Sequence, residues 1–572
     1  MDKRKPFTLK KIILIGCFVT AVSSFTYYED LFQISKNMEI FSSVYKELAV
    51  NYVDDVNSSK LMKTSIDAML GNLDPYTNFV QESDMENYKM QFQSAKYGGI
   101  GATVIIRDGK TIITDTFEGS PANKADLRAG DEIVQINKIP VRGKDNDQTS
   151  VLLRGDKSSP VKMLISRPGV SAPIEKDLVR DEILQPNVTY YGMLPNNVGY
   201  IMLDRFLENS AKEVRNALTE LQKNNLSGLI LDLRNNGGGL VHESIQIVNL
   251  FVQKDIAAVI QKGRNRENNQ TYKTPAEPIA PNLPLVVLIN DHSASASEIV
   301  AGSLQDLDRA VIVGQRSFGK GLVQKTVSLP YNTLVKVTVA KFYTPSGRCI
   351  QALDYTHRTE AGIVEKVSDS LITEYKTINN KRSVYDGRGV YPDIFVNPLS
   401  KNLISQTLES KFYIFDYATK FRNSNPTIAD AKNFKLTDAQ YSDFVKYLSD
   451  KDYTYDTRTE ALLNNLKTEA EKEDKMAEIK SEFEALKNKV SVSKKNDLTQ
   501  YKDEIRRLLE NEIASRYYFQ KGRIENSFRT DEDMTAALKA IDNKNTFASI
   551  LKGEGAYKSI GKPSSGFSAK KK

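Results

Sequence analysis

The chain has 572 residues, with 79 Lys and Arg against 72 Asp and Glu, which gives a formal net charge of +7. At about 100–200 residues per domain, this length predicts about three to five domains. Hydrophobic residues make up 40% and charged residues 26%, a balance that excludes a disordered chain and a coiled coil. Basic and acidic residues are interleaved except at Lys570–Lys572, so the sequence lacks the basic face of a nucleic-acid-binding protein.

Cysteine and histidine are scarce. The two cysteines are Cys17 and Cys349, and Cys17 lies in an N-terminal apolar stretch. If that stretch is removed, one thiol remains and no intramolecular disulfide can form. The chain has no CxxC pair, and His242, His292 and His357 are far apart in sequence. These features argue against a structural zinc site and a metalloenzyme.

The N-terminus has the pattern of an export signal. Basic residues between Lys3 and Lys11 precede the apolar run Ile12–Val22, which is shorter than the roughly 20 residues of a membrane span. Ala21–Ser23 offers a cleavage site, and Leu14–Cys17 resembles a lipoprotein box that the continuing apolar run weakens. We expect an exported, envelope-associated protein whose segment 1–25 is a signal peptide or a retained anchor. The alternative is a buried N-terminal helix.

Four kinds of segment follow in chain order. Apolar residues at helical spacing predict helices over 26–95, and Asp74–Pro75 interrupts this pattern. Short alternating runs separated by turns predict a β-rich module over 96–170. The predicted strands of this module are Ala102–Ile106, Thr111–Thr114, Glu132–Ile136 and Val161–Ser166.

Strands then alternate with helices over 171–400, which predicts an α/β domain. The expected strands are Val198–Leu203, Leu229–Leu233, Leu285–Ile289, Val311–Val313 and Leu334–Ala340. The expected helices are Asn209–Asn224, Leu240–Val252 and Ser297–Leu307. Over 401–572 the apolar residues step by three and four, as in Met476–Val490, which predicts an accessory domain of amphipathic helices.

The segment Asn290–Glu298 contains three serines that alternate with alanines between an apolar strand and a helix. A turn of this kind exposes a side chain and points backbone N–H groups toward it. The serines therefore form a candidate nucleophile turn, and the alternative is that they only cap the helix.

The segment Gly314–Gly321 resembles a phosphate-binding loop, but Gly321 replaces the required Ser or Thr, and the following residues alternate like a strand. The alternative is that Lys320 acts as a base, with Phe318, Leu322 and Val323 supplying apolar surroundings. A desolvated lysine loses its charge more readily, and its neutral amine can take a proton from a serine hydroxyl.

A strand that ends in three glycines, Leu231–Gly239, offers backbone N–H groups with no Cβ in the way. Next to a nucleophile, this turn is a candidate oxyanion hole. Away from one, it is an ordinary loop.

Together these motifs resemble the C-terminal processing peptidases, also called tail-specific proteases. Asp232–Gly239, Ser293–Glu298 and Ser317–Gln324 occur in the order that the family has, and Lys320 follows Ser295 by 25 positions as in its members. Weaker family signatures are matched by Leu73–Tyr76, Tyr343–Arg348 and Gly389–Asp393. The resemblance extends from about Phe41 to Pro398.

The resemblance implies a serine endopeptidase with a crotonase-like α/β core and neither metal nor organic cofactor. It makes Ser295 the nucleophile, Lys320 the general base and Gln324 the residue that orients the lysine. The implied oxyanion donors are the N–H groups of Ala296 and Gly238, although Gly237 stands where the family often has Pro or Ser. A histidine-based hydrolase that pairs His292 with Ser295 is an alternative, but three residues of separation on a turn rarely permit attack.

The β-rich module then resembles a PDZ domain. Gly99, Ile100, Gly101 and Ala102 stand where such domains bind a C-terminal carboxylate through backbone N–H groups, while the peptide adds as a strand. Leu152 and Leu153 would line the pocket for the last side chain. We expect an α/β multidomain protein that binds unfolded or C-terminally exposed substrates in the periplasm, with 401–572 serving self-association or an adaptor. The rival hypothesis is a peptide-binding scaffold with an inactive core.

Overall fold

The structure is a computed structural model that describes residues 31–85, 88–89, 96–359 and 362–562. The predicted export segment 1–25 lies outside the described residues. No helix within the described ranges is long and apolar enough to cross a membrane. The chain divides into two compact units: Met1–Glu82 with Gln324–Thr338, and Ser83–Val323 with Val339–Lys572.

The first unit combines helices with short strands that pair with one another. It contains a helix over 31–51, α2 (Ser58–Gly71), β1 (Asn78–Val80), most of β17 (Leu322–Leu329) and the start of β18 (Thr333–Tyr343). The Asp74 carboxylate accepts N–H bonds from Tyr76 and Thr77, which turns the chain out of the helix. β1 then pairs with β18, Val80 opposite Leu334. The prediction of helices alone is therefore wrong for 78–80.

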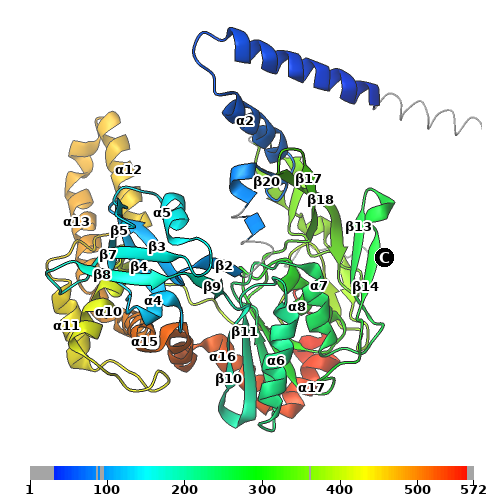
Figure 1. Cartoon of the computed structure of the whole chain (residues 1–572). Helices are drawn as coiled ribbons and strands as arrows, with labels where there is room; N and C mark the ends of the chain where they lie inside the picture. Colours follow the sequence, from blue (N-terminus) through cyan, green and yellow to red (C-terminus); the bar gives the residue numbers. More distant parts are fainter. Residues whose placement is uncertain (1–30, 86–87, 90–95, 360–361, 563–572) are drawn as a thin grey trace, which may run out of the picture. The chain divides into compact units, whose positions relative to one another are not determined.

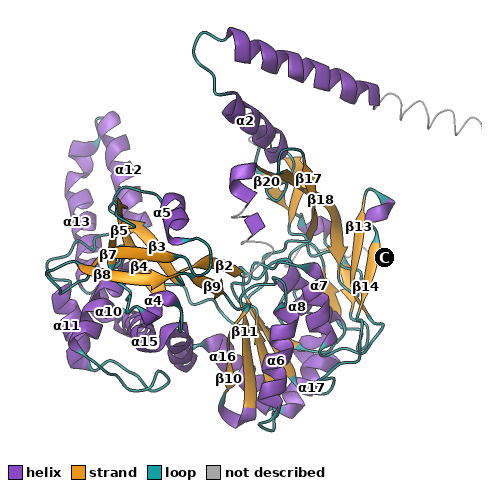
Figure 2. Ribbon diagram, viewed as in Figure 1, coloured by secondary structure: helices purple, strands orange, loops and turns teal. Residues whose placement is uncertain are grey.

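Residues 96–184 of the second unit form the β-rich module, whose predicted strands are confirmed (Figures 1 and 2). Its sheet has the order β3-β4-β5-β7-β8, with β3 at an edge, and β2 pairs with β9. The elements are β2 (Lys96–Gly99), β3 (Ala102–Arg107), β4 (Lys110–Thr116), α4 (Pro121–Lys124), β5 (Glu132–Ile136), β6 (Ile139–Pro140), α5 (Asn146–Leu153), β7 (Pro160–Ser166), β8 (Ile174–Val179) and β9 (Asp181–Leu184). Ile113, Ile133 and Ile165 are among its fully buried core residues.

A six-stranded sheet forms the centre of the following α/β part, in the order β10-β11-β12-β15-β16-β23. All strands are parallel except β10, which is antiparallel to β11. The strands are β10 (Val188–Met193), β11 (Val198–Leu203), β12 (Gly228–Asp232), β15 (Leu285–Ile289), β16 (Val311–Gly314) and β23 (Ile394–Phe395). β12 and β15 are buried along their whole length, which explains why they are continuous apolar runs rather than alternating ones.

Helices cover both faces of this sheet, as Figure 1 shows. One face packs against α6 (Ser210–Gln222), α7 (Val241–Asn249) and α8 (Ala296–Asp306). The other face packs against α16 (Glu532–Asp542) and α17 (Lys544–Lys552) from the C-terminal tail. Gly228 on β12 permits this contact, since a Cβ there would lie 2.7 Å from Ile541 Cγ2. The end of the predicted accessory domain thus completes the core.

Smaller strands flank the central sheet. In the second unit, β13 (Ala257–Gly263) pairs with β14 (Gln270–Lys273) and with Ala340–Tyr343 of β18. Two hairpins follow, formed by β19 (Leu353–Arg358) with β20 (Val364–Lys366) and by β21 (Glu374–Lys376) with β22 (Ser383–Tyr385).

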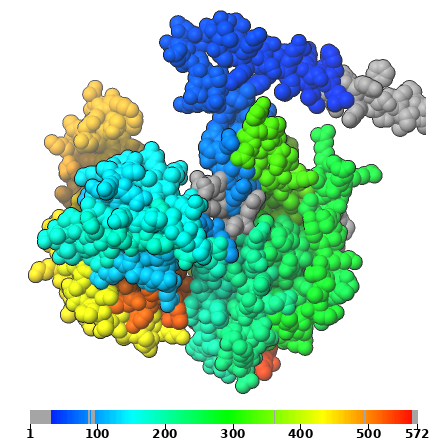
Figure 3. All heavy atoms as spheres, viewed as in Figure 1, coloured from blue at the N-terminus to red at the C-terminus, as the bar shows by residue number. Residues whose placement is uncertain are grey.

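The remaining tail helices are α9 (Leu403–Ser410), α10 (Tyr413–Ser424), α11 (Asp438–Tyr447), α12 (Arg458–Lys472), α13 (Met476–Lys495), α14 (Asp497–Gln500) and α15 (Lys502–Ser527), so the helical prediction is confirmed. Among them, α9, α10, α11, α14 and α15 share a core of their own, and α10 contacts the β-rich module (Figure 3). Arg107 of β3 donates to Asp416 of α10 at 2.9 and 3.1 Å. Gly130 lies against Thr419, where a Cβ would come within 2.6 Å of Thr419 Cγ2.

Candidate active site

Ser295 occupies a strained turn between β15 and α8. Its backbone angles are φ 55° and ψ −111°, outside the region that a non-glycine residue normally adopts. Strain of this kind persists only where the surrounding structure holds it, and it is concentrated at functional sites. The side chain is half-buried, while the first residues of α8 that follow it are fully buried.

The two neighbouring serines have structural roles. Ser293 donates its hydroxyl to the Leu233 carbonyl at 2.8 Å, and Ser297 donates to the Asn236 carbonyl at 2.8 Å. Both side chains are fully buried. They join the segment Asn290–Glu298, the serine turn, to the segment that follows β12. The middle serine, Ser295, differs from both neighbours in exposure and in backbone strain.

Lys320 lies in the loop between β16 and β17, where the Phe318 N–H donates to the Ser293 carbonyl at 3.0 Å. The glycines on either side let the loop approach its neighbours closely: a Cβ on Gly319 would lie 2.4 Å from Ala352 Cβ. The loop leads into strand β17 rather than a helix, which removes the phosphate-loop alternative. Lys320 is half-buried and Leu322 is buried, but the side chain of Phe318 is 48% exposed and gives no apolar cover.

A buried carboxylate joins the serine turn to the lysine loop. Glu298 Oε2 accepts the N–H of Ser295 at 2.8 Å and the N–H of Lys320 at 2.9 Å. Its Oε1 accepts the Ser317 hydroxyl at 2.6 Å and the Gly319 N–H at 2.7 Å. The backbones of Ser295 and Lys320 are therefore both within 3 Å of one oxygen atom.

Burial dominates the electrostatics of Glu298. The side chain has no exposed surface, and this burial raises the pKa of the Glu298 carboxyl although four hydrogen bonds oppose the rise. Four donors on two oxygens fit the ionised form, which only accepts hydrogen bonds. This role of Glu298 was not predicted from the sequence. The available signal was its position three residues after a serine at a helix start, the spacing of a capping box.

The turn Gly237–Gly239, the glycine turn, lies directly against Ser295. A Cβ on Gly238 would be 2.8 Å from both Ser295 Cβ and the Ala296 nitrogen, and its φ of 96° also favours glycine. The Gly238 N–H donates to Asn236 Oδ1 at 2.9 Å, so an oxyanion would share or displace that bond. Ala296 is the first residue of α8, where N–H groups lack intrahelical acceptors. The assignment of Ala296 and Gly238 as oxyanion donors stays a prediction with this geometry.

Gln324 belongs to the first unit, where its Nε2 donates to Thr338 Oγ1 at 3.2 Å. Thr338 in turn donates its N–H to Thr77 Oγ1 at 3.1 Å. The role of Gln324 in orienting Lys320 stays a prediction.

The histidine alternative finds no support in the geometry. The His292 side chain is 73% exposed, and its Nδ1 lies 2.7 Å from Asp291 Oδ1. No hydrogen bond joins it to Ser295 among the described residues. Within the same residues, no group of three or more His, Cys, Asp or Glu side chains is placed to hold a metal ion.

The predicted peptide site of the β-rich module is a groove between edge strand β3 and helix α5. It is lined by Gly99, Ile100, Gly101, Ala102 and Leu153, together with Tyr97, Thr103, Val104, Asn146, Ser150, Arg154 and Gln185. Leu152 is not part of this lining. Gly101 has φ 72°, and a Cβ there would lie 2.4 Å from Ser120 Cβ, so the loop requires glycine.

Comparisons with known proteins match three successive parts of the chain. The model of peptidase family S41 matches residues 197–358, that of a PDZ domain matches 112–167, and that of a probable PDZ-protease C-terminal helical domain matches 404–541. A carboxy-terminal-processing protease of Bartonella bacilliformis is 33% identical over 327 residues, which are 56% of this chain and 74% of the relative. The carboxy-terminal processing protease CtpA of Bacillus subtilis is 33% identical over 336 residues, 58% of this chain and 71% of the relative. Among solved structures, the photosystem II D1 C-terminal processing protease is 28% identical and covers 63% of this chain and 92% of its own, with a TM-score of 0.33.

Proposed function

Because the chain belongs to the carboxy-terminal processing proteases of peptidase family S41, we propose that it is an exported endopeptidase that cleaves protein substrates with a Ser295–Lys320 dyad. It is a serine-type peptidase with a PDZ domain and a C-terminal helical domain. The observation that carries the dyad is the Glu298 carboxylate, whose Oε2 accepts the N–H groups of both residues.

In the proposed reaction, the neutral amine of Lys320 takes the hydroxyl proton of Ser295 as its oxygen attacks the scissile carbonyl carbon. The C–N bond breaks, and the lysine ammonium returns the proton to the leaving amine. Lys320 then takes a proton from a water molecule whose oxygen attacks the acyl carbon, and it returns the proton to Ser295 as the ester bond breaks. The N–H groups of Ala296 and Gly238 stabilise the oxyanion, because fixed donors need no reorganisation when the charge develops.

The PDZ groove would select substrates by their C-termini. The edge position of β3 leaves room for a peptide to add as a further strand, with its carboxylate at Gly99–Ala102. Leu153 and Ile100 supply the apolar pocket for a final side chain. The proposed substrates are therefore unfolded or exposed C-terminal tails that end in an apolar residue.

The rival function is a peptide-binding scaffold with an inactive core. The backbone of Ser295 favours the enzyme, since its φ of 55° with ψ of −111° lies outside the left-handed helical region, and strain of this kind is concentrated at functional sites. The proposed export to the cell envelope rests on the basic residues before Ile12–Val22. Cell fractionation tests it, and recovery of the uncleaved chain in the cytosol would contradict it.

The test uses an unfolded protein that ends in an apolar tail, with mass spectrometry of the products. The wild-type protein should cleave it, and Ser295→Ala should not. Amidation of the substrate C-terminus should lower cleavage about tenfold, the equivalent of about 1.4 kcal/mol for a lost charge-assisted contact. Absence of cleavage by the wild type would favour the scaffold function. Equal cleavage of the acid and amide substrates would contradict recognition of the C-terminal carboxylate.

A further inference from the structure

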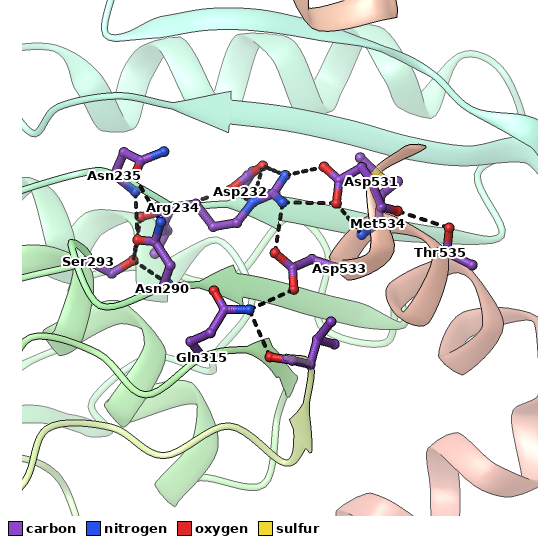
Figure 4. A network of polar contacts seen from close by, with 12 residues as sticks. Asp232, Arg234, Asn235, Asn290, Ser293, Gln315, Asp531, Asp533, Met534 and Thr535 are labelled. Atoms are coloured by element: carbon purple, nitrogen blue, oxygen red, sulfur yellow. Dashed lines mark hydrogen bonds and ion pairs between the residues drawn. The ribbon is translucent and has the colours of Figure 1, made fainter. Parts of the chain in front are cut away.

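The guanidinium of Arg234 lies among three carboxylates, two of which come from the C-terminal tail (Figure 4). Arg234 follows the end of β12 by two residues, and its Nη2 is 2.6 Å from Asp232 Oδ2. It donates to Asp531 at 3.0 and 2.8 Å and to Asp533 at 2.9 Å. Only 17% of the Arg234 side chain is exposed. Burial of this kind makes an arginine depend on its partners, because an unpaired buried charge is costly.

Asp533 also accepts a hydrogen bond from a residue that follows a second strand, β16. Gln315, the residue after β16, donates its Nε2 to Asp533 Oδ1 at 3.0 Å and to the Val396 carbonyl at 3.0 Å (Figure 4). One carboxylate from α16 therefore holds the segments that follow β12 and β16. These segments lead into the glycine turn and the Lys320 loop.

The first two residues after Arg234 are hydrogen-bonded to the serine turn. Asn235 exchanges two hydrogen bonds with Asn290, both 2.9 Å long. The Asn236 carbonyl accepts the Ala294 N–H at 3.0 Å, and the Asn236 side chain accepts the N–H of Gly238. A displacement of Arg234 would thus be transmitted to Gly238, four residues later.

The two tail carboxylates are on a rigid support. Asp531 is the N-cap of α16, and its Oδ1 accepts the Met534 N–H at 2.9 Å. Met534, Ala537 and Ile541 are buried against the central sheet. The position of both carboxylates is therefore fixed by the packing of α16 on the sheet.

We propose that Asp531 and Asp533 are positioning residues for catalysis, which hold Arg234 and Gln315 and so keep the oxyanion turn aligned with Ser295. This makes the C-terminal end of the chain part of the catalytic framework. The inference rests on the proposed function, because it assigns the aligned turn to the acylation of Ser295.

The test variant is Asp531→Asn combined with Asp533→Asn in the full chain. Asn is as good an N-cap as Asp and has nearly the same shape, and the amide oxygen of Asn at position 533 can still accept from Gln315. The change removes the charge and places an NH₂ group of each new amide against Arg234, which also only donates. Charge-assisted hydrogen bonds are about twice as strong as neutral ones, so the hold on Arg234 weakens. We expect kcat and the rate at which a fluorophosphonate labels Ser295 to fall about ten- to a hundredfold. This loss is smaller than the 10²–10³-fold loss of kcat that follows deletion of an oxyanion donor. KM should change less than twofold.

Glu532→Gln is the matched control, because Glu532 lies between the two aspartates and is exposed. It should keep wild-type rates, and melting curves of all variants report the fold. An intact double variant that is labelled at the wild-type rate would overturn the proposal, as would an equal loss in Glu532→Gln. A wild-type protein that takes no label at Ser295 would refute the proposed function instead.

A double-mutant cycle with Arg234→Lys separates positioning from general stability. A lysine keeps the charge but cannot form the forked contacts with two carboxylates. If the acids act through Arg234, their removal should cost several-fold less in the Arg234→Lys background. The single Asp533→Asn variant, which keeps the Asp531 contacts, should show an intermediate loss. Equal costs in both backgrounds would overturn the proposal even if every variant is less stable.

Discussion

The serine turn and the glycine turn lie side by side, but different parts of the chain hold them. The serine turn is held from within the core: Glu298, three residues after Ser295, binds both Ser295 and Lys320 through their N–H groups. The glycine turn is held by Asp531, which contacts Arg234 across 297 positions of sequence. Ser295 is therefore held by contacts within the core, whereas the glycine turn is held by the tail as well, and the tail also reaches the start of the Lys320 loop through Gln315 and Asp533.

The largest expected effect is at Lys320. Lys320→Arg keeps the positive charge, but a guanidinium does not deprotonate at usable pH, so it cannot serve as a base. Activity on an unfolded substrate should fall about 10⁴-fold, as when a member of a catalytic triad is removed. Substantial residual activity would reduce Lys320 to an electrostatic role and break the dyad assignment.

Glu298→Gln should produce the next largest loss. All four contacts of the carboxylate are donors, so the NH₂ group of glutamine would face either Ser295 and Lys320 or Ser317 and Gly319. We expect kcat to fall about 10²–10³-fold, the range found when an active-site donor is displaced. A variant with normal kcat would show that the serine turn does not depend on Glu298.

Ser297→Ala tests the contact between the two turns. The change removes the hydrogen bond to the Asn236 carbonyl, which keeps the Ala294 N–H as a donor. It should lower stability by about 1 kcal/mol and kcat only a few-fold. Chemical denaturation and steady-state kinetics measure the two effects. A loss as large as that of Ser295→Ala would mean that the segment is structural and that no single serine is the nucleophile.

The smallest expected effect is the pH dependence of stability that arises from the titration of Glu298. Because burial raises the folded-state pKa of Glu298, the native state binds more protons than the unfolded state between the ordinary value of 4.5 and the raised one. Stability from this group is therefore present at low pH and declines as pH rises through the folded pKa. The melting temperature of the wild type relative to Glu298→Gln, which does not titrate, should decline over that window. An increase would mean that the hydrogen bonds outweigh burial.

The sequence predicted the serine turn and the core strands because their signals are local. β15 is a short apolar run followed by a turn, and the three serines lie within five residues. It could not predict where α16 packs, since an amphipathic pattern reveals an apolar face but not the surface that covers it. The partners of Arg234 are likewise set by the tertiary fold. β1 was missed because three residues after a helix carry too little pattern.

The central claim, that Ser295 is the nucleophile, is tested most directly by site-resolved labelling. The full-length protein is treated with a fluorophosphonate, digested and analysed by mass spectrometry that separates Ser293, Ser295 and Ser297. We expect a single phosphonylated residue, Ser295, and no label in the Ser295→Ala protein. Ser293 and Ser297 should stay unmodified because they are buried and hydrogen-bonded. Label on either neighbour, or label that persists in Ser295→Ala, would contradict it.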